Sequence, residues 1–176
     1  MILYLREIPK EGRKLVLNEF TGELTESLKD IVGALPYRLE ADIIPMGESY
    51  DIRGEIQTSS EQTCSFCADT FWLPIKEKFH EMILGEDQKT LSGFDENWLH
   101  EDVHVLDLEN PYEFNFGELI HEVVALAIPS QPECQKNCKG LCPECGENRN
   151  EEDCHCAEQK KLEESPFSVL KSVNLN

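Results

Sequence analysis

The sequence predicts an α+β fold: an antiparallel β-meander with one main helix and a C-terminal zinc-knuckle module. Two observations predict it. Three long stretches in the first half alternate apolar with polar residues, which is the period of half-buried strands. Six of the eight cysteines crowd between Cys134 and Cys156. We expect a sheet-plus-helix domain over 1–132 and a cysteine-rich zinc-binding module with its tail over 133–176, packed on the first.

The strands are expected in chain order, with a proline and glycine turn signal between the first two. Pro74 favours an edge position or a break near the start of its strand, because proline cannot donate a ladder hydrogen bond. The tetrapeptide Met46–Ser49 is the expected hairpin connection. The expected strands are Met1–Ile8, Lys14–Leu17, Tyr37–Pro45, Tyr50–Thr58, Phe71–Leu84 and a short one at Val103–Leu108.

Helical spacing of apolar residues predicts two helices. The first covers Leu24–Val32 and is followed by Gly33, a common helix stop. The main helix covers Phe116–Ala127, where six apolar residues share one face, and Pro129 ends it.

The eight cysteines predict metal binding, because the chain has no secretory signal that would favour disulfides. Cys142-Pro143-Glu144-Cys145-Gly146 has the form of a zinc knuckle, a tight turn that supplies two thiolates. Cys154 and Cys156 can complete that tetrahedron locally. We therefore expect two structural Zn²⁺ ions in closed sites that do not activate water. The expected ligands are Cys64, Cys67, Cys134 and Cys138 for site 1, and Cys142, Cys145, Cys154 and Cys156 for site 2. Spacing alone leaves the exact division of the thiols open.

Sharper alternatives exist for several of these residues. Cys138, Cys142 and Cys145 have the spacing that holds an iron–sulfur cluster in radical enzymes, but the chain is too short for the barrel that such chemistry needs. Cys64 and Cys67 could be a redox dithiol, although they do not precede a helix. For other residues a functional role is possible, but an ordinary solvated or packed side chain is the better interpretation. These are His155 as a substitute ligand, Asp95, Glu96, His100 and His104 as a metal-binding cluster, and Trp72 and Trp98 as base-stacking groups.

The charge of the chain points to a basic partner. The net charge is −19, and residues 86–122 contain one lysine and 11 acidic residues, a net charge of −10. Such a field repels free RNA and anionic membranes and attracts basic proteins. Candidate partner-binding residues are Glu101, Asp102, Asp107 and Glu109; the alternative is a solvated acidic loop.

Several function classes are disfavoured by the sequence. No apolar run approaches the ~18 residues of a membrane helix, and the first residues do not resemble a signal peptide. No phosphate loop or catalytic serine motif is present, so we expect neither a small-molecule substrate nor an enzyme. We expect a soluble cytoplasmic protein.

Three stretches resemble the bacterial and chloroplast YceD family. They are the Cys64/Cys67 pair between strands, the segment from Asp107 through Glu118–Glu122 to Ala125–Pro129, and Cys134 followed by Cys138–Asn150. The tail segment Pro166–Lys171 is also similar to the family. The resemblance covers most of residues 38–171. One departure is Arg149, where the family has an apolar residue between the two asparagines.

This resemblance implies a non-enzymatic factor for the accumulation of large-subunit ribosomal RNA, acting in ribosome assembly. The implied partners are a pre-ribosomal large subunit or a basic ribosomal protein. Some family members lack several tail cysteines, which implies that site 2 is dispensable for the shared function. Two other functions stay open: a direct RNA-binding zinc protein, and a thiol redox or metal-dependent enzyme.

Overall fold

The computed structural model describes residues 1–47, 49–84, 104–107, 113–152 and 154–156. These residues form two compact units. The first contains the described residues of Met1–Glu61 and Trp72–Ser130, and the second contains Gln62–Phe71 with the described residues from Gln131 onward. The domain division at residue 132 stays a prediction, because compactness alone does not show which parts fold independently.

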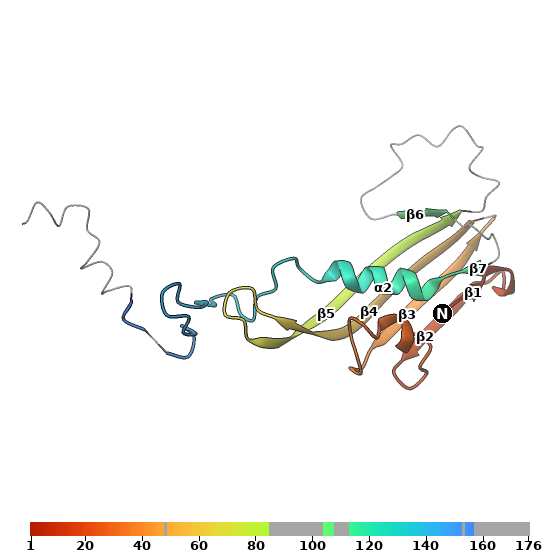
Figure 1. Cartoon of the computed structure of the whole chain (residues 1–176). Helices are drawn as coiled ribbons and strands as arrows, with labels where there is room; N and C mark the ends of the chain where they lie inside the picture. Colours follow the sequence, from red (N-terminus) through yellow and green to blue (C-terminus); the bar gives the residue numbers. More distant parts are fainter. Residues whose placement is uncertain (48, 85–103, 108–112, 153, 157–176) are drawn as a thin grey trace, which may run out of the picture. The chain divides into compact units, whose positions relative to one another are not determined.

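The first unit is built on a five-stranded sheet with the order β2-β3-β4-β5-β6 (Figure 1). Strands β2 and β3 pair antiparallel, as do β3 and β4. The strands are β2 (Arg13–Asn18), β3 (Arg38–Met46), β4 (Ser49–Thr63), β5 (Thr70–Leu84) and β6 (His104–Asp107). A separate two-stranded sheet pairs β1 (Leu3–Tyr4) with β7 (Glu113–Phe114), and the 3-10 helix η1 (Leu5–Glu7) follows β1.

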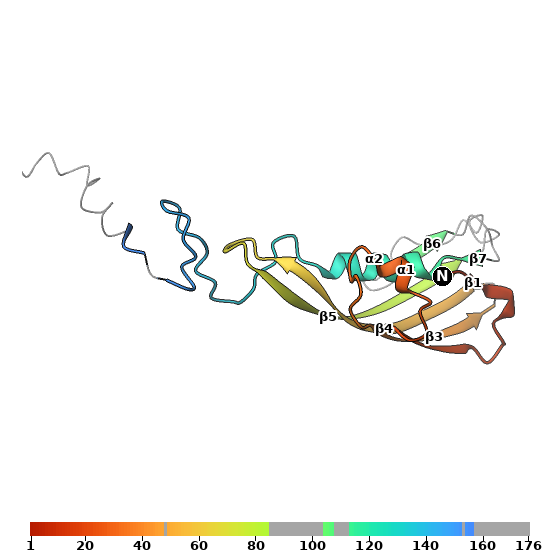
Figure 2. The same cartoon turned by 60° about the horizontal axis from the view of Figure 1, so that its bottom comes forward.

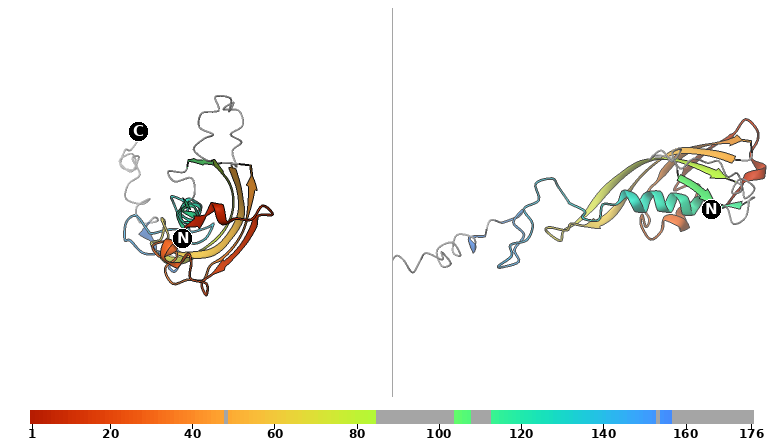
Figure 3. Two further views of the ribbon diagram at one scale, coloured as in Figure 1. Left: turned by 90° about the vertical axis from the view of Figure 1, so that its right-hand side faces the viewer. Right: turned by 90° about the horizontal axis from the view of Figure 1, so that it is seen from above.

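One face of the sheet forms the core, and both helices cover it. Along β3, Leu39, Ala41 and Ile43 are buried, whereas the residues between them are more exposed. Figures 2 and 3 show α1 (Thr25–Leu28) and α2 (Phe116–Ala127) on the same, concave side of the curved sheet. The alternation of the sequence therefore translates directly into an inner and an outer sheet face.

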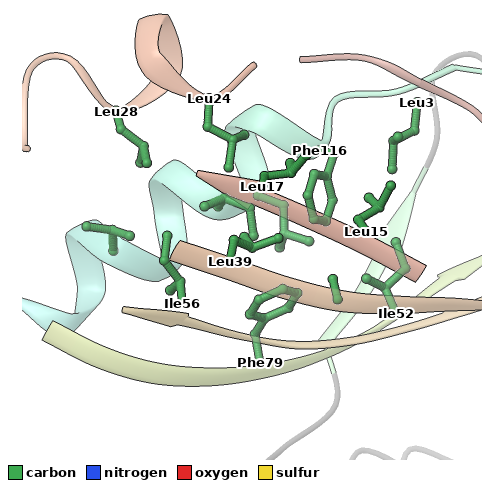
Figure 4. Packing of buried hydrophobic residues seen from close by; sticks show 14 of the residues in the cluster. Leu3, Leu15, Leu17, Leu24, Leu28, Leu39, Ile52, Ile56, Phe79 and Phe116 are labelled. Carbon is green, nitrogen blue, oxygen red and sulfur yellow. The ribbon is translucent and has the colours of Figure 1, made fainter. Parts of the chain in front are cut away.

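The helix α2 matches the predicted main helix at both ends. The Asn115 side chain caps it by accepting a hydrogen bond from the Glu118 N–H at 3.3 Å. Its Phe116 is fully buried, with its ring centroid 6.4 Å from that of Phe79 on β5 (Figure 4). The α+β class and the main helix are thus confirmed.

A glycine in β4 makes this packing possible. A Cβ built on Gly54 would lie 2.5 Å from the Phe79 ring and 2.7 Å from the Glu40 carbonyl oxygen. The Phe79 ring therefore occupies the space that any larger residue at position 54 would need.

The structure corrects four element predictions. The strand expected at Met1–Ile8 is only the two residues of β1, because η1 follows at once. The helix expected at Leu24–Val32 is only α1, and turns continue to Gly33, whose φ of 64° ends any helix. Strand β4 continues five residues beyond the predicted Thr58. There Ser60 is buried and its hydroxyl donates to the Ile31 carbonyl, so the polar residues after Thr58 are also part of the sheet.

The fourth correction concerns the meander. Strand β6 pairs with β5 in parallel, over Glu81–Leu84 only, so the sheet is not antiparallel throughout. Pro74 does not break β5. Within the described residues, β4 is the only strand beside β5 at Pro74, which agrees with the edge position predicted for it.

Candidate metal centres

The first candidate centre begins with the turn that joins β4 to β5. In this turn the Ala68 N–H donates to the Cys64 carbonyl at 3.0 Å, and the Cys64 N–H donates to the Asp69 carbonyl at 2.8 Å. Ala68 has φ of 62°, in the left-handed region that non-glycine residues rarely adopt. The turn directs Cys64 and Cys67 toward the same point, and both are buried.

The second centre begins with a turn of the same design. The Gly146 N–H donates to the Cys142 carbonyl at 2.9 Å, and the Cys142 N–H donates to the Glu147 carbonyl at 2.8 Å. Gly146 has φ of 77° and stands where Ala68 stands in the first turn. We call Cys64–Asp69 the first knuckle and Cys142–Glu147 the second knuckle.

Each knuckle meets two further cysteines. The ligand atoms of each group of four lie within 4.8 Å of one another. In the first group the Sγ atoms of Cys64 and Cys138 are 3.8 Å apart, and those of Cys67 and Cys134 are 3.6 Å apart. The structure therefore brings together the same two sets that the sequence predicted. The first group is Cys64, Cys67, Cys134 and Cys138, and the second group is Cys142, Cys145, Cys154 and Cys156.

This geometry suits one metal ion for each group. A tetrahedral ion with Zn–S bonds of about 2.3 Å holds its sulfurs about 3.8 Å apart, close to the two distances in the first group. Four thiolates and no other ligand type form a tetrahedral S₄ set, which is typical of zinc or iron. The three-cysteine cluster alternative is not supported, because Cys138 belongs to the first group whereas Cys142 and Cys145 belong to the second.

Backbone N–H groups favour the charged form of one thiol in each group. Burial raises the pKa of Cys64, but the N–H groups of Cys67, Cys134 and Phe66 outweigh it and lower the pKa from 9.0 to about 6. The N–H groups of Cys145 and Glu144 lower the pKa of Cys142 to about 6. One thiol of each knuckle therefore ionises more readily than an ordinary cysteine.

Other thiols in each group resist ionisation when no cation is present. The hydrogen bond with Cys145, followed by burial, raises the pKa of Cys156 to about 12. Although the Asp69 N–H acts to lower it, burial and the neighbouring thiols raise the pKa of Cys67. A divalent cation would offset the repulsion among four thiolates. Four thiols this close together are therefore suited to binding such a cation. Burial also argues against a redox role for Cys64 and Cys67, since a catalytic dithiol must be accessible.

The segment Lys139–Asn150 contacts the first knuckle. The Leu141 N–H donates to the Phe66 carbonyl at 2.8 Å, and Asn148 Nδ2 donates to Asp69 Oδ2 at 2.7 Å. Gly140 has φ of 68°, and a Cβ there would lie 3.0 Å from the Phe66 carbonyl oxygen. Asn148 and Asn150 were not among the site residues predicted from the sequence. The available signal was the Asn-x-Asn pattern just after a knuckle, since asparagine favours such turns.

The remaining candidate residues have no part in these groups. His155 is exposed and is not among the four residues of the second group. Trp72 is 58% exposed at the start of β5. Asp107 and His104 are the two ends of β6. Outside the described residues lie Glu101, Asp102 and Glu109, together with Asp95, Glu96, His100 and Trp98.

Comparison with known proteins places the chain in a family context. Residues 52–174 match the family described as "Large ribosomal RNA subunit accumulation protein YceD". The chain is similar to the "Large ribosomal RNA subunit accumulation protein YCED homolog 1, chloroplastic" of Arabidopsis thaliana, with 22% identity over 157 residues. That alignment covers 78% of this chain and 49% of the relative, so the chain spans about half the length of that protein. No solved structure matches. Within the described residues, every helix is too short or too polar to cross a membrane.

Proposed function

This chain belongs to the YceD family, and we propose from that membership that it acts in the accumulation of large-subunit ribosomal RNA. The family match over residues 52–174 carries the proposal, because it includes both cysteine groups and α2. The family is named for RNA accumulation and not for a reaction, which supports a role in binding and assembly instead of catalysis. The cytoplasm, expected from the sequence, is the proposed location.

Deletion of the gene tests this role. The expected result is a lower ratio of mature large-subunit to small-subunit rRNA, measured on total RNA and on ribosome profiles. Reintroducing the wild-type chain should restore the ratio. A normal ratio in the deletion strain, also under rapid growth or cold, would contradict the proposal.

The two cysteine groups are proposed to hold one Zn²⁺ each, with a structural role. The support is the sulfur spacing in the first group and the four protein donors of each group, which leave a tetrahedral ion without an open position. When bound, zinc supplies the folding free energy of the cysteine-rich segments. Because such an ion has no open position to activate water, the same donor sets also support the proposal that the protein is not an enzyme.

The proposed direct partner is a pre-ribosomal large subunit or a basic ribosomal protein. The support is the net charge of −19, of which −10 falls in residues 86–122. A partner of opposite charge associates faster because the electrostatic field steers it, and salt weakens that effect. Free RNA should bind this chain weakly, because phosphate binding requires a surplus of basic groups.

Charge reversal tests the partner. Replacing Glu101, Asp102, Asp107 and Glu109 by lysine should slow association with a basic ribosomal protein and leave the metal content unchanged. The matched control reverses four exposed acidic residues of the first unit, Glu7, Glu11, Glu19 and Glu23, with the same change in net charge. If both variants slow association equally, residues 101–109 are not the contact surface. Sub-micromolar binding of rRNA fragments in physiological salt, unaffected by either variant, would favour direct RNA binding instead.

A further inference from the structure

The side chain of Asn150 lies against the first cysteine group and makes four hydrogen bonds. Its Nδ2 donates to Cys138 Sγ at 3.3 Å and to Asn148 Oδ1 at 2.9 Å. Its Oδ1 accepts from the Lys139 N–H at 2.8 Å and from Gln135 Nε2 at 3.3 Å. A carboxamide has two N–H donors and two acceptor positions, so Asn150 uses its full capacity.

These partners determine which way the carboxamide faces. If its oxygen and nitrogen were exchanged, Oδ1 would face the sulfur of Cys138 and the oxygen of Asn148, and the NH₂ group would face the Lys139 N–H. The contacts with the Asn148 oxygen and the Lys139 N–H would be repulsive, as would that with a Cys138 thiolate, so only the orientation that donates to sulfur fits this environment. The thiolate form of Cys138 is the better acceptor, because hydrogen bonds to charged groups are stronger.

A second asparagine holds Asn150 in place and connects it to the first knuckle. Asn148 Oδ1 accepts from the backbone N–H of Asn150 at 3.0 Å as well as from its side chain. Asn148 Nδ2 then donates to the Asp69 carboxylate, whose residue also closes the first knuckle through its carbonyl. A continuous series of hydrogen bonds therefore runs from Cys138 through two asparagines to Asp69 of the first knuckle.

We propose that Asn150 is a positioning residue for the first metal centre: it donates a hydrogen bond to the Cys138 thiolate and, through Asn148, couples that ligand to the first knuckle. The proposal rests on the proposed zinc binding. Groups that hydrogen-bond to metal ligands fix their orientation and tune their donor strength, and their loss costs about 10- to 100-fold in metal affinity. Its consequence is that the first centre depends on a residue outside its four cysteines, on the segment that carries the second knuckle.

The test compares Asn150→Asp with Asn137→Asp in the full chain loaded with two zinc ions. Asn150→Asp keeps an oxygen for the Lys139 N–H but removes the donor to sulfur. Asn137 is exposed, adjoins Cys138 and makes no side-chain hydrogen bond to the described residues, so its replacement adds the same charge without removing a donor. We expect one of the two zinc ions to leave Asn150→Asp about 10- to 100-fold faster in the presence of a chelating dye. Release from Asn137→Asp should match the wild type.

Cobalt substitution provides a readout that a merely structural role would not change. Without the N–H donor, the Cys138 thiolate is a stronger electron donor, so a sulfur-to-cobalt charge-transfer band should move to lower energy in Asn150→Asp and not in Asn137→Asp. If Asn150→Asp does not fold, Asn148→Ala is measured in the same way, and it should release one ion faster than Asn137→Asp. Equal release rates and equal spectra in the Asn150 or Asn148 variant and the Asn137 variant would overturn the proposal. A wild-type chain that binds neither zinc nor cobalt would instead overturn the zinc proposal, and this one with it.

Discussion

The two cysteine groups start from the same turn but differ in where their other ligands come from. Each knuckle has the same pair of backbone hydrogen bonds and a left-handed residue after its second cysteine. The first knuckle meets cysteines far away in sequence, since Cys67 and Cys134 are 67 residues apart. The second group lies entirely within residues 142–156. Similar local chemistry therefore serves two purposes: the first group closes a long loop, and the second folds a short one.

This difference has an energetic consequence. The entropic cost of closing a loop grows with the logarithm of its length, and a metal that bridges the loop removes that cost from folding. The loop from Cys67 to Cys134 is about seven times longer than that from Cys145 to Cys154, so the difference is about 2 kcal/mol. The two knuckles also differ in burial. Cys64 and Cys67 are each only 2% accessible to solvent, whereas Cys145 of the second knuckle lies on the surface.

The largest expected effect comes from removing one ligand in each group. Cys67→Ser should lower the free energy of unfolding by about 2 kcal/mol more than Cys145→Ser, because it opens the longer loop. Both variants should lose one zinc ion. Denaturant unfolding at a fixed free zinc concentration measures the difference, and equal losses would mean that loop length does not distinguish the two groups.

A pair of glycine substitutions compares the surroundings of the two groups. Gly140 and Gly146 both have positive φ, but a Cβ at Gly140 meets the Phe66 carbonyl whereas one at Gly146 meets nothing within 4 Å. Gly146→Ala should cost about 1 kcal/mol of unfolding free energy from the left-handed conformation alone. Gly140→Ala should cost about 2–3 kcal/mol, since it also forces the Phe66 backbone to move. Thermal unfolding of the two variants checks the order; the reverse order would show that segment 139–150 does not depend on this close approach.

Metal removal should proceed in two phases. The second group, in which Cys145 is exposed, should lose zinc at least about tenfold faster than the first group, in which the equivalent Cys67 is buried; this ratio corresponds to about 1.4 kcal/mol of local opening free energy. A chelating dye follows the release, and Cys145→Ser should lack the fast phase. A single phase, or a fast phase that survives in Cys145→Ser, would contradict the difference in protection.

The smallest expected effect is a gain of stability. Ala68 occupies the left-handed position that glycine occupies in the second knuckle. Ala68→Gly removes the steric cost of that conformation, of about 1–2 kcal/mol, and loses part of the gain because glycine is freer in the unfolded chain. We expect a net stabilisation of about 0.5–1 kcal/mol, seen as a higher midpoint of denaturant unfolding. A lower midpoint would show that the two knuckles are not equivalent at this position.

The features that the sequence predicted well are those with local signals. The ends of α2 were predicted from the apolar period and Pro129, and the second knuckle was predicted from Cys142-Pro143-Glu144-Cys145-Gly146. The grouping of Cys64 and Cys67 with Cys134 and Cys138 could be predicted because, once the second group was assigned, only these four thiols were left to form a tetrahedron.

What the sequence did not predict depends on contacts between distant segments. Asn148 and Asn150 gain their roles from Asp69 and Cys138, which the fold brings to them. The continuation of β4 past Thr58 comes with a hydrogen bond from Ser60 to the distant Ile31 carbonyl, and β6 pairs in parallel with β5, a strand about 20 residues earlier in the chain. Apart from the Asn-x-Asn pattern after the second knuckle, no periodic or spacing signal in the sequence marks these contacts.

Native mass spectrometry of the full chain, purified without added metal, tests the central claim most directly. Two closed tetrathiolate centres predict a mass increase of two zinc ions per chain, and of one in either Cys67→Ser or Cys145→Ser. A chain that carries iron, or that holds less than one zinc, would contradict the account of two structural zinc centres.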